Sequence, residues 1–87
     1  MVIERELQRL GQRLRALRSC AGETQATTAA AVGLARPYLS AVEGGRKNIT
    51  LETLYALAEH FDIDPTELLR NGQPDADQKA STNTGRG

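Results

Sequence analysis

The stretch Thr24–Val42, TQATTAAAVGLARPYLSAV, decides the fold of this chain. Thr24 is suited to begin a helix, because its hydroxyl can accept a hydrogen bond from an unpaired N–H of the first turn. Gly33 can adopt the positive φ that ends a helix, and Pro37 falls where a first helical turn tolerates its missing N–H. The stretch therefore predicts a short helix, a tight turn at Gly33 and a second short helix over residues 36–43.

This spacing is that of a helix-turn-helix, whose second helix can lie in the major groove of DNA. At about 100° per residue, Leu39 and Val42 share the inward face of the second helix. Pro37, Ser40 and Ala41 point the opposite way, and such small side chains suit a surface that lies close against something. The pattern indicates DNA binding as the class of function.

A longer helix is predicted over residues 4–19. Its apolar residues repeat at alternating intervals of four and three and form one continuous stripe, which is made up of Ile3, Leu7, Leu10, Leu14 and Leu17. A coiled coil would have the same pattern, but the run is too short and ends at residues 19–22. Packing of the stripe against a core is the better interpretation.

Two further helices are predicted after the central stretch. Thr50 can cap a helix over residues 51–61. Asp64 can cap another, with Pro65 in its first turn and Glu67 in the position that closes a capping box. We expect no strand, so the predicted fold is all-α with five short helices.

The length of 87 residues leaves room for one small domain, which we expect to span residues 1–70. Residues 71–87 contain no Val, Ile, Leu or aromatic residue. We expect them to form a flexible tail, because such a segment cannot offset its own ordering entropy. A domain of about 70 residues is near the lower limit for a self-sufficient core, so dimerisation would be a useful source of stability.

The net charge is zero, but the charges are unevenly distributed. Residues 1–50 carry eight Lys and Arg against four Glu, whereas residues 51–87 carry three Lys and Arg against seven Asp and Glu. Such polarity gives one end of the molecule a positive field. On charge alone, a DNA-binding pole and an ordinary mixed surface are both open interpretations.

The chain has one cysteine, Cys20, and one histidine, His60. This excludes an internal disulfide and leaves no Cys and His set for zinc. We interpret Cys20 as a small helix-end residue and His60 as a solvated helix residue. No paired carboxylates, Cys–His pair or phosphate-binding glycine loop indicates an enzyme, and we expect neither cofactor nor metal. Without a signal peptide or an apolar run of roughly 20 residues, we expect a cytoplasmic protein with no membrane contact.

Residues 10–69 resemble the helix-turn-helix family of Cro and phage-repressor type, often called XRE. The matching elements are Leu10-Gly11 through Arg18, Thr24-Gln25, Ala29, Gly33-Leu34, RPYLSAVEGGRKNITLETL at 36–54, and Ala58, Phe61, Ile63, Leu68 and Leu69. The segment 36–54 looks most like the small controller proteins of restriction–modification systems and other stand-alone repressors. The resemblance implies a compact five-helix, lambda-repressor-like domain.

Four residues depart from the family pattern. Thr28 replaces a large aliphatic residue, which we expect to cost about 2–4 kcal/mol if the position is buried. Ala35 replaces the usual Ser or Thr cap of the second helix, at about 1 kcal/mol. Glu23 replaces an apolar residue, and Ile49 replaces a common Pro. We expect these changes to affect stability more than function, and a dimer could compensate for them.

The resemblance implies which residues contact bases. Arg36 is the first choice, because a guanidinium can bond guanine O6 and N7 together; a phosphate contact is the open alternative. Tyr38 would lie at the edge of the groove, with packing against the neighbouring helix as the alternative. The full predicted base-contacting set is Arg36, Pro37, Tyr38, Ser40 and Ala41.

The resemblance also implies phosphate contacts from two segments, the start of the first helix of the pair and the loop after the second. The predicted set is Thr24, Gln25, Gly44, Arg46, Lys47 and Asn48. For Arg46 and Lys47 the alternative is a solvated loop. Arg18 and Glu43 resemble a pair that the family forms between its first helix and the end of its recognition helix. The alternative for that pair is two unrelated exposed charges, worth about 0–1 kcal/mol.

The favoured function is a sequence-specific transcriptional regulator that binds a palindromic operator as a homodimer. Double-stranded DNA is then the main partner, and the dimer interface is predicted to include Tyr55, Ile63 and Leu69. An alternative is the antitoxin of a toxin–antitoxin pair, which would bind a toxin as well as its own operator. A protein-binding adaptor without a DNA role is a third interpretation.

Overall fold

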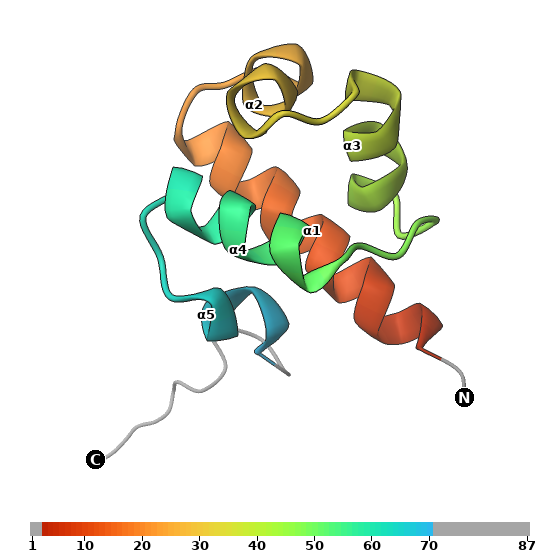
Figure 1. Cartoon of the computed structure of the whole chain (residues 1–87). Coiled ribbons are helices and arrows are strands. Elements are labelled where there is room, and N and C mark those ends of the chain that lie inside the picture. Colours follow the sequence, from red (N-terminus) through yellow and green to blue (C-terminus); the bar gives the residue numbers. More distant parts are fainter. Residues whose placement is uncertain (1–2, 71–87) are drawn as a thin grey trace.

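A computed structural model of the chain describes residues 3–70 and contains only helices there. The helices are α1 (Glu4–Cys20), α2 (Gln25–Val32), α3 (Arg36–Glu43), α4 (Leu51–His60) and α5 (Pro65–Leu69) (Figure 1). The prediction of an all-α fold with five helices is confirmed. The tail expected over residues 71–87 lies outside the described residues. None of the helices within residues 3–70 is long and apolar enough to cross a bilayer.

The helices enclose one aliphatic core. In Figure 1, α1 crosses the molecule diagonally, with α2 and α3 above it and α4 passing in front. α1 packs against α3 and α5, α2 packs against α3 and α4, and α4 packs against α5. The buried cluster at the centre consists of Leu10, Leu14, Val42, Leu54, Leu57, Ala58 and Leu68. Because α3 contributes Val42 to this cluster, its opposite face is turned outward.

The helix boundaries follow from the capping residues that the sequence indicated. The Thr24 hydroxyl accepts a hydrogen bond from the Thr27 N–H at 3.0 Å, and the Thr50 hydroxyl accepts one from the Thr53 N–H at 3.1 Å. Gly33 ends α2 with a φ of 75°, in the left-handed region that a glycine adopts without a steric penalty. As expected, α3 begins without a side-chain cap, because Ala35 has no acceptor.

The start of α5 corrects one prediction. The Asp64 carboxylate caps the helix as expected and accepts hydrogen bonds from the Thr66 N–H at 2.9 Å and the Thr66 hydroxyl at 2.8 Å. Glu67, however, does not close a capping box. Its carboxylate accepts a hydrogen bond from Arg70 Nη2 at 2.9 Å. α5 is only five residues long, so the cation after its end is within reach and takes the Glu67 side chain.

A buried glycine sets the distance between α1 and α3. A Cβ atom at Gly11 would overlap the main-chain carbonyl oxygens of Val42 and Glu43. The last turn of α3 therefore lies directly against the backbone of α1. This contact fixes the end of α3 on the long helix, and with it the direction in which the outward face of α3 points.

Candidate nucleic-acid interface

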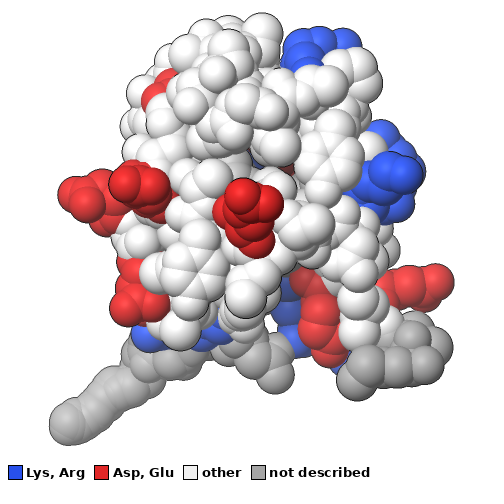
Figure 2. Space-filling view, viewed as in Figure 1, with Lys and Arg blue, Asp and Glu red and all other residues white. Residues whose placement is uncertain are grey.

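The outward face of α3 is built from short side chains and one arginine. Its inner face is buried through Leu39 and Val42. Four residues predicted to contact bases are exposed or half-buried on α3, namely Arg36, Pro37, Ser40 and Ala41. Figure 2 shows Lys and Arg side chains along the edge of the molecule that carries α3, and Asp and Glu side chains near the C-terminal end of α4. In this view basic side chains gather beside α3, although acidic side chains lie below them on the same edge.

Arg36 is held in place by a residue of α2. Arg36 Nη1 donates a hydrogen bond to Gln25 Oε1 at 3.1 Å, and Gln25 Nε2 donates one to Glu43 Oε1 at 3.0 Å. A carboxylate can only accept, so it fixes which end of the Gln25 amide faces Arg36. The structure therefore brings together two residues predicted for different roles, one for bases and one for phosphates. Arg36 is exposed, and this contact uses one of its five N–H groups.

The acceptor beneath Gln25 is itself fixed by Arg18. Arg18 Nε donates to Glu43 Oε2 at 2.7 Å and Arg18 Nη2 donates to Glu43 Oε1 at 3.0 Å, a bidentate pair. The third nitrogen, Nη1, donates to the main-chain oxygen of Glu23 at 2.9 Å. Glu43 is 5% exposed, so the interpretation as two unrelated surface charges is wrong. The pair connects α1, the end of α3 and the residue before α2.

Opposing effects act on the Glu43 carboxyl. Burial alone would raise its pKa, since a low-dielectric surrounding disfavours the charged form. The hydrogen bonds from Arg18 and Gln25 and the positive charges of Arg18 and Arg15 outweigh that effect, so the pKa lies below its usual value. The Glu43 pair likewise raises the pKa of the Arg18 guanidinium. Both groups are charged at neutral pH, as a structural ion pair requires.

Tyr38 supports the loop that follows α3. Its ring packs, half-buried, against the core cluster, and its hydroxyl donates a hydrogen bond to the main-chain oxygen of Asn48 at 2.9 Å. The Asn48 side chain in turn accepts a hydrogen bond from the Ile49 N–H at 2.9 Å. The packing alternative weighed for Tyr38 therefore describes its position, and its predicted contact with bases stays a prediction.

The predicted phosphate-contacting loop leaves α3 through a tight turn. The Arg46 N–H donates to the Ala41 main-chain oxygen at 2.9 Å, and Gly45 has a φ of 74°. A Cβ atom at Gly45 would come within 2.9 Å of Gln8 Cγ on α1, so the turn also lies close against α1. The predicted phosphate-contacting residues Thr24, Gly44, Arg46, Lys47 and Asn48 are all exposed.

A polar cluster that the sequence reasoning missed joins the start of α2 to the end of α4. Thr28 is 1% exposed, and its hydroxyl donates to Glu23 Oε1 at 2.6 Å. His60 Nε2 lies 2.8 Å from the same oxygen, and the His60 ring packs edge-on against Phe61. The interpretation of His60 as a solvated residue is wrong, because the end of α4 turns its ring toward Glu23.

This cluster changes the meaning of two departures from the family pattern. Thr28 and Glu23, each polar where the family has an apolar residue, bond to each other, so the buried Thr28 hydroxyl is satisfied. The hydrogen bond from Thr28, followed by that from His60, lowers the pKa of the Glu23 carboxyl. In the sequence, the signal for this cluster was the pair of polar replacements at Glu23 and Thr28, together with the single histidine, His60.

Three large apolar residues of α4 and α5 form an exposed apolar patch, because Leu51 and Leu69 line one groove and Tyr55 lies one helical turn after Leu51. Leu51, Tyr55 and Leu69 are 67%, 56% and 61% exposed, respectively. Of the three residues predicted for a dimer interface, Tyr55 and Leu69 belong to this patch, whereas Ile63 packs half-buried against the core cluster. Ile63 is therefore less accessible than the other two, and the assignment of Tyr55, Ile63 and Leu69 to a dimer interface stays a prediction. Leu51 is an exposed apolar residue that the sequence reasoning did not assign to this interface.

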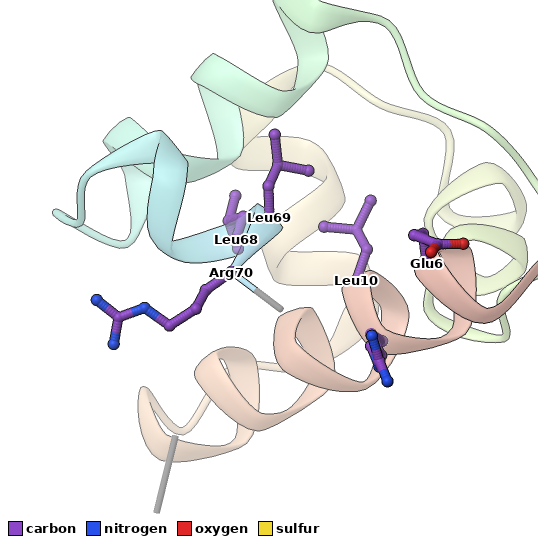
Figure 3. Close-up of a pocket in the computed structure, with 6 residues that line it drawn as sticks. Glu6, Leu10, Leu68, Leu69 and Arg70 are labelled. Atoms are coloured by element: carbon purple, nitrogen blue, oxygen red, sulfur yellow. The ribbon is translucent and has the colours of Figure 1, made fainter. Parts of the chain in front are cut away.

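Two shallow grooves flank Leu69. One, of about 330 Å³, lies between α1 and α5 and is lined by Glu6, Arg9, Leu10, Leu68, Leu69 and Arg70 (Figure 3). The other, of about 260 Å³, is mostly apolar and runs from Leu69 past Ile3 and Leu7 to Leu51. Leu69 therefore stands between two hollows on the same side as the exposed residues of α4.

Residues 9–70 match the helix-turn-helix domain family. The chain belongs to this family. It is 40% identical over 72 residues to the HTH-type transcriptional regulator DdrOP3 of Deinococcus deserti, in a match that covers 83% of this chain and 56% of that protein. It is 38% identical over 60 residues to the uncharacterized HTH-type transcriptional regulator y4dJ of Sinorhizobium fredii, in a match that covers 69% of this chain and 78% of that protein. The chain thus spans little more than half the length of the Deinococcus relative.

Solved structures of similar proteins share the fold. The restriction–modification controller protein C.AhdI from Aeromonas hydrophila superposes with a TM-score of 0.69 at 45% identity, over 71% of this chain and 94% of that one. The hypothetical transcription factor NHTF from Neisseria superposes with a TM-score of 0.76 at 30% identity, over 87% of this chain and 85% of that one. The resemblance to helix-turn-helix regulators and restriction–modification controllers is therefore confirmed.

Proposed function

We propose that this chain is a sequence-specific transcriptional regulator that binds a palindromic DNA operator as a homodimer, with α3 in the major groove. The observation that carries the proposal is the exposed Arg36 at the start of α3, oriented by Gln25 at the start of α2. The names of the relatives as transcriptional regulators and of a solved neighbour as a restriction–modification controller support the same conclusion.

Arg36 reads bases in this proposal. Its guanidinium donates to O6 and N7 of a guanine, a contact worth about 1–3 kcal/mol of discrimination. Pro37, Ser40 and Ala41 have short side chains, so the backbone of α3 approaches the base edges closely. With few other long polar groups on this face, backbone contacts and DNA shape supply the rest of the specificity.

The flanking segments bind phosphates. The first turn of α2, after Thr24 and including Gln25, has N–H groups and a positive dipole end that suit a phosphate. On the other side of α3, Arg46 and Lys47 are exposed cations on a loop. Each phosphate that they neutralise adds about −0.9 to the slope of log K against log salt. Gly44 and Asn48 belong to the same loop and offer main-chain and amide groups.

A second copy of the chain covers the apolar patch of Leu51, Tyr55 and Leu69. One recognition helix buries too little surface for tight specific binding, whereas two helices about 34 Å apart read two half-sites. The patch does not include α3, so a dimer formed through it leaves both recognition helices accessible.

Binding to the DNA upstream of its own reading frame and to a shuffled duplex, measured by fluorescence anisotropy at two salt concentrations, tests the proposal. We expect preferential and steeply salt-dependent binding to the first DNA. Arg36→Ala should abolish the preference without changing the melting temperature. Arg5→Ala removes an exposed arginine of α1 that belongs neither to the recognition surface nor to the apolar patch, and serves as the matched control. Equal, weak binding of the wild type to both duplexes at low salt would refute the proposal.

A further inference from the structure

Glu23 occupies a position that should hinder DNA binding. It directly precedes Thr24, the N-cap of α2, and the first turn of α2 is the phosphate site of the proposed function. The N-terminal end of a helix attracts anions through its unpaired N–H groups and its dipole. An acidic side chain one residue before the cap is therefore a built-in competitor of a DNA phosphate.

The structure holds this carboxylate elsewhere. Glu23 Oε1 lies 2.6 Å from the Thr28 hydroxyl, which comes from the second turn of α2. The same oxygen lies 2.8 Å from His60 Nε2 at the end of α4. The main-chain oxygen of Glu23 accepts a hydrogen bond from Arg18 Nη1 at 2.9 Å, so the backbone is fixed while the side chain is turned toward α4. Thr24, not Glu23, caps the Thr27 N–H.

We propose that Thr28 and His60 act as a clamp that keeps the Glu23 carboxylate away from the first turn of α2, so that this turn remains open to a DNA phosphate. Thr28 and His60 are positioning residues, since they act through Glu23 and do not contact DNA. The inference rests on the DNA-binding function proposed above and assigns a role to three polar residues that the recognition surface does not use.

Thr28→Val is the decisive substitution. Thr28 is 1% exposed, and valine has nearly the same shape, so the change opens no cavity and leaves no buried donor unpaired. We therefore expect a melting temperature within a few degrees of the wild type. The Glu23 carboxylate then keeps only its contact with His60, and its greater freedom should weaken DNA binding at low salt by about two- to fivefold per half-site, the range expected for one charge at a helix end. Thr28→Ser retains the hydroxyl and is the matched control that should bind as the wild type does.

A second substitution separates clamping from a general structural role. Adding Glu23→Gln to Thr28→Val removes the competing charge, so affinity should return to within about twofold of the wild type. If Thr28→Val binds DNA as tightly as the wild type, or if the double variant remains as weak as Thr28→Val, the inference is refuted.

A measurement without DNA distinguishes this inference from the proposed function. Inorganic phosphate is titrated into each variant, and the amide chemical shifts of Gln25 and Ala26 are followed by NMR. We expect weaker saturation for Thr28→Val than for the wild type, and recovery in the double variant. If the wild type fails to bind DNA but these phosphate responses differ as expected, the proposed function fails and the clamp stands. Identical phosphate responses would refute the clamp even if the wild type binds DNA.

Discussion

Glu43→Gln tests whether the buried ion pair beneath the recognition surface is needed. Glu43 accepts two hydrogen bonds from Arg18 and one from Gln25, and its side chain is 1% exposed. Removing one partner of a buried pair costs about 3–5 kcal/mol, because the other charge stays buried without compensation. The Arg18 side chain is 16% exposed and retains its bond to the Glu23 oxygen, so we expect a loss slightly below that range, about 2–3 kcal/mol. For a domain of this size that corresponds to a melting temperature lower by about 10–20 °C.

Thermal unfolding followed by circular dichroism measures this loss. A melting temperature of Glu43→Gln within about 3 °C of the wild type would refute the reasoning, because it would mean that Arg18 does not depend on the Glu43 charge. The double variant Arg18→Met/Glu43→Leu replaces both charges by apolar groups and should regain most of the stability. It should still lose operator preference, because Gln25 no longer has the acceptor that orients it toward Arg36. Recovery of both properties in the double variant would show that the orientation of Gln25 is unimportant.

Three further outcomes are expected. Gly11→Ala forces a Cβ against the carbonyls of the last turn of α3 and should cost about 1–3 kcal/mol despite the better helix propensity of alanine; an unchanged denaturant midpoint would contradict the close approach. Leu69→Asp should shift the molecule toward monomers in sedimentation equilibrium and weaken operator binding in proportion, whereas an unaltered mass would exclude the patch as the interface. The folded-state pKa values of Glu43 and Glu23 lie below their ordinary value of 4.5, so the unfolded chain binds protons more readily. Their stabilisation is complete above about pH 4.5 and is lost as the pH falls through the folded values; Glu43→Gln should flatten that acid dependence in melting curves.

Features encoded locally were predictable from the sequence. Thr24 and Thr50 cap the helices that follow them, and Gly33 ends α2, because a capping hydroxyl and a positive φ depend only on residues a few positions away. The spacing of the apolar residues in α1 likewise predicts which face of that helix is buried. For these elements the sequence pattern and the structure agree to within about one residue.

Features that depend on packing between distant elements were not predictable. Ile63 follows the end of α4 and packs partly against the core, whereas Leu51, the first residue of α4, stays exposed. Their shared apolar character does not distinguish the two, because the difference depends on which other helices lie beside each residue. In the sequence, His60 resembles a solvated helix residue. Its contact with Glu23 could not be predicted, because Glu23 lies 37 residues earlier. The capping box predicted for Glu67 failed for a local reason. α5 is so short that Arg70, just after its end, binds the Glu67 carboxylate.

The buried Arg18–Glu43 pair is better explained by geometry than by stability. In a core this small, an apolar pair of similar volume would stabilise the fold at least as well, because the desolvation of two charges offsets most of their attraction. An apolar pair could not present a fixed acceptor to Gln25. The ion pair orients the Glu43 carboxylate of α3 toward the Gln25 amide of α2. The Gln25 amide in turn accepts a hydrogen bond from Arg36 at the start of α3. The orientation of the exposed guanidinium is thus set by a charge that lies within the protein, which is why altering that charge should change DNA recognition even where stability is restored.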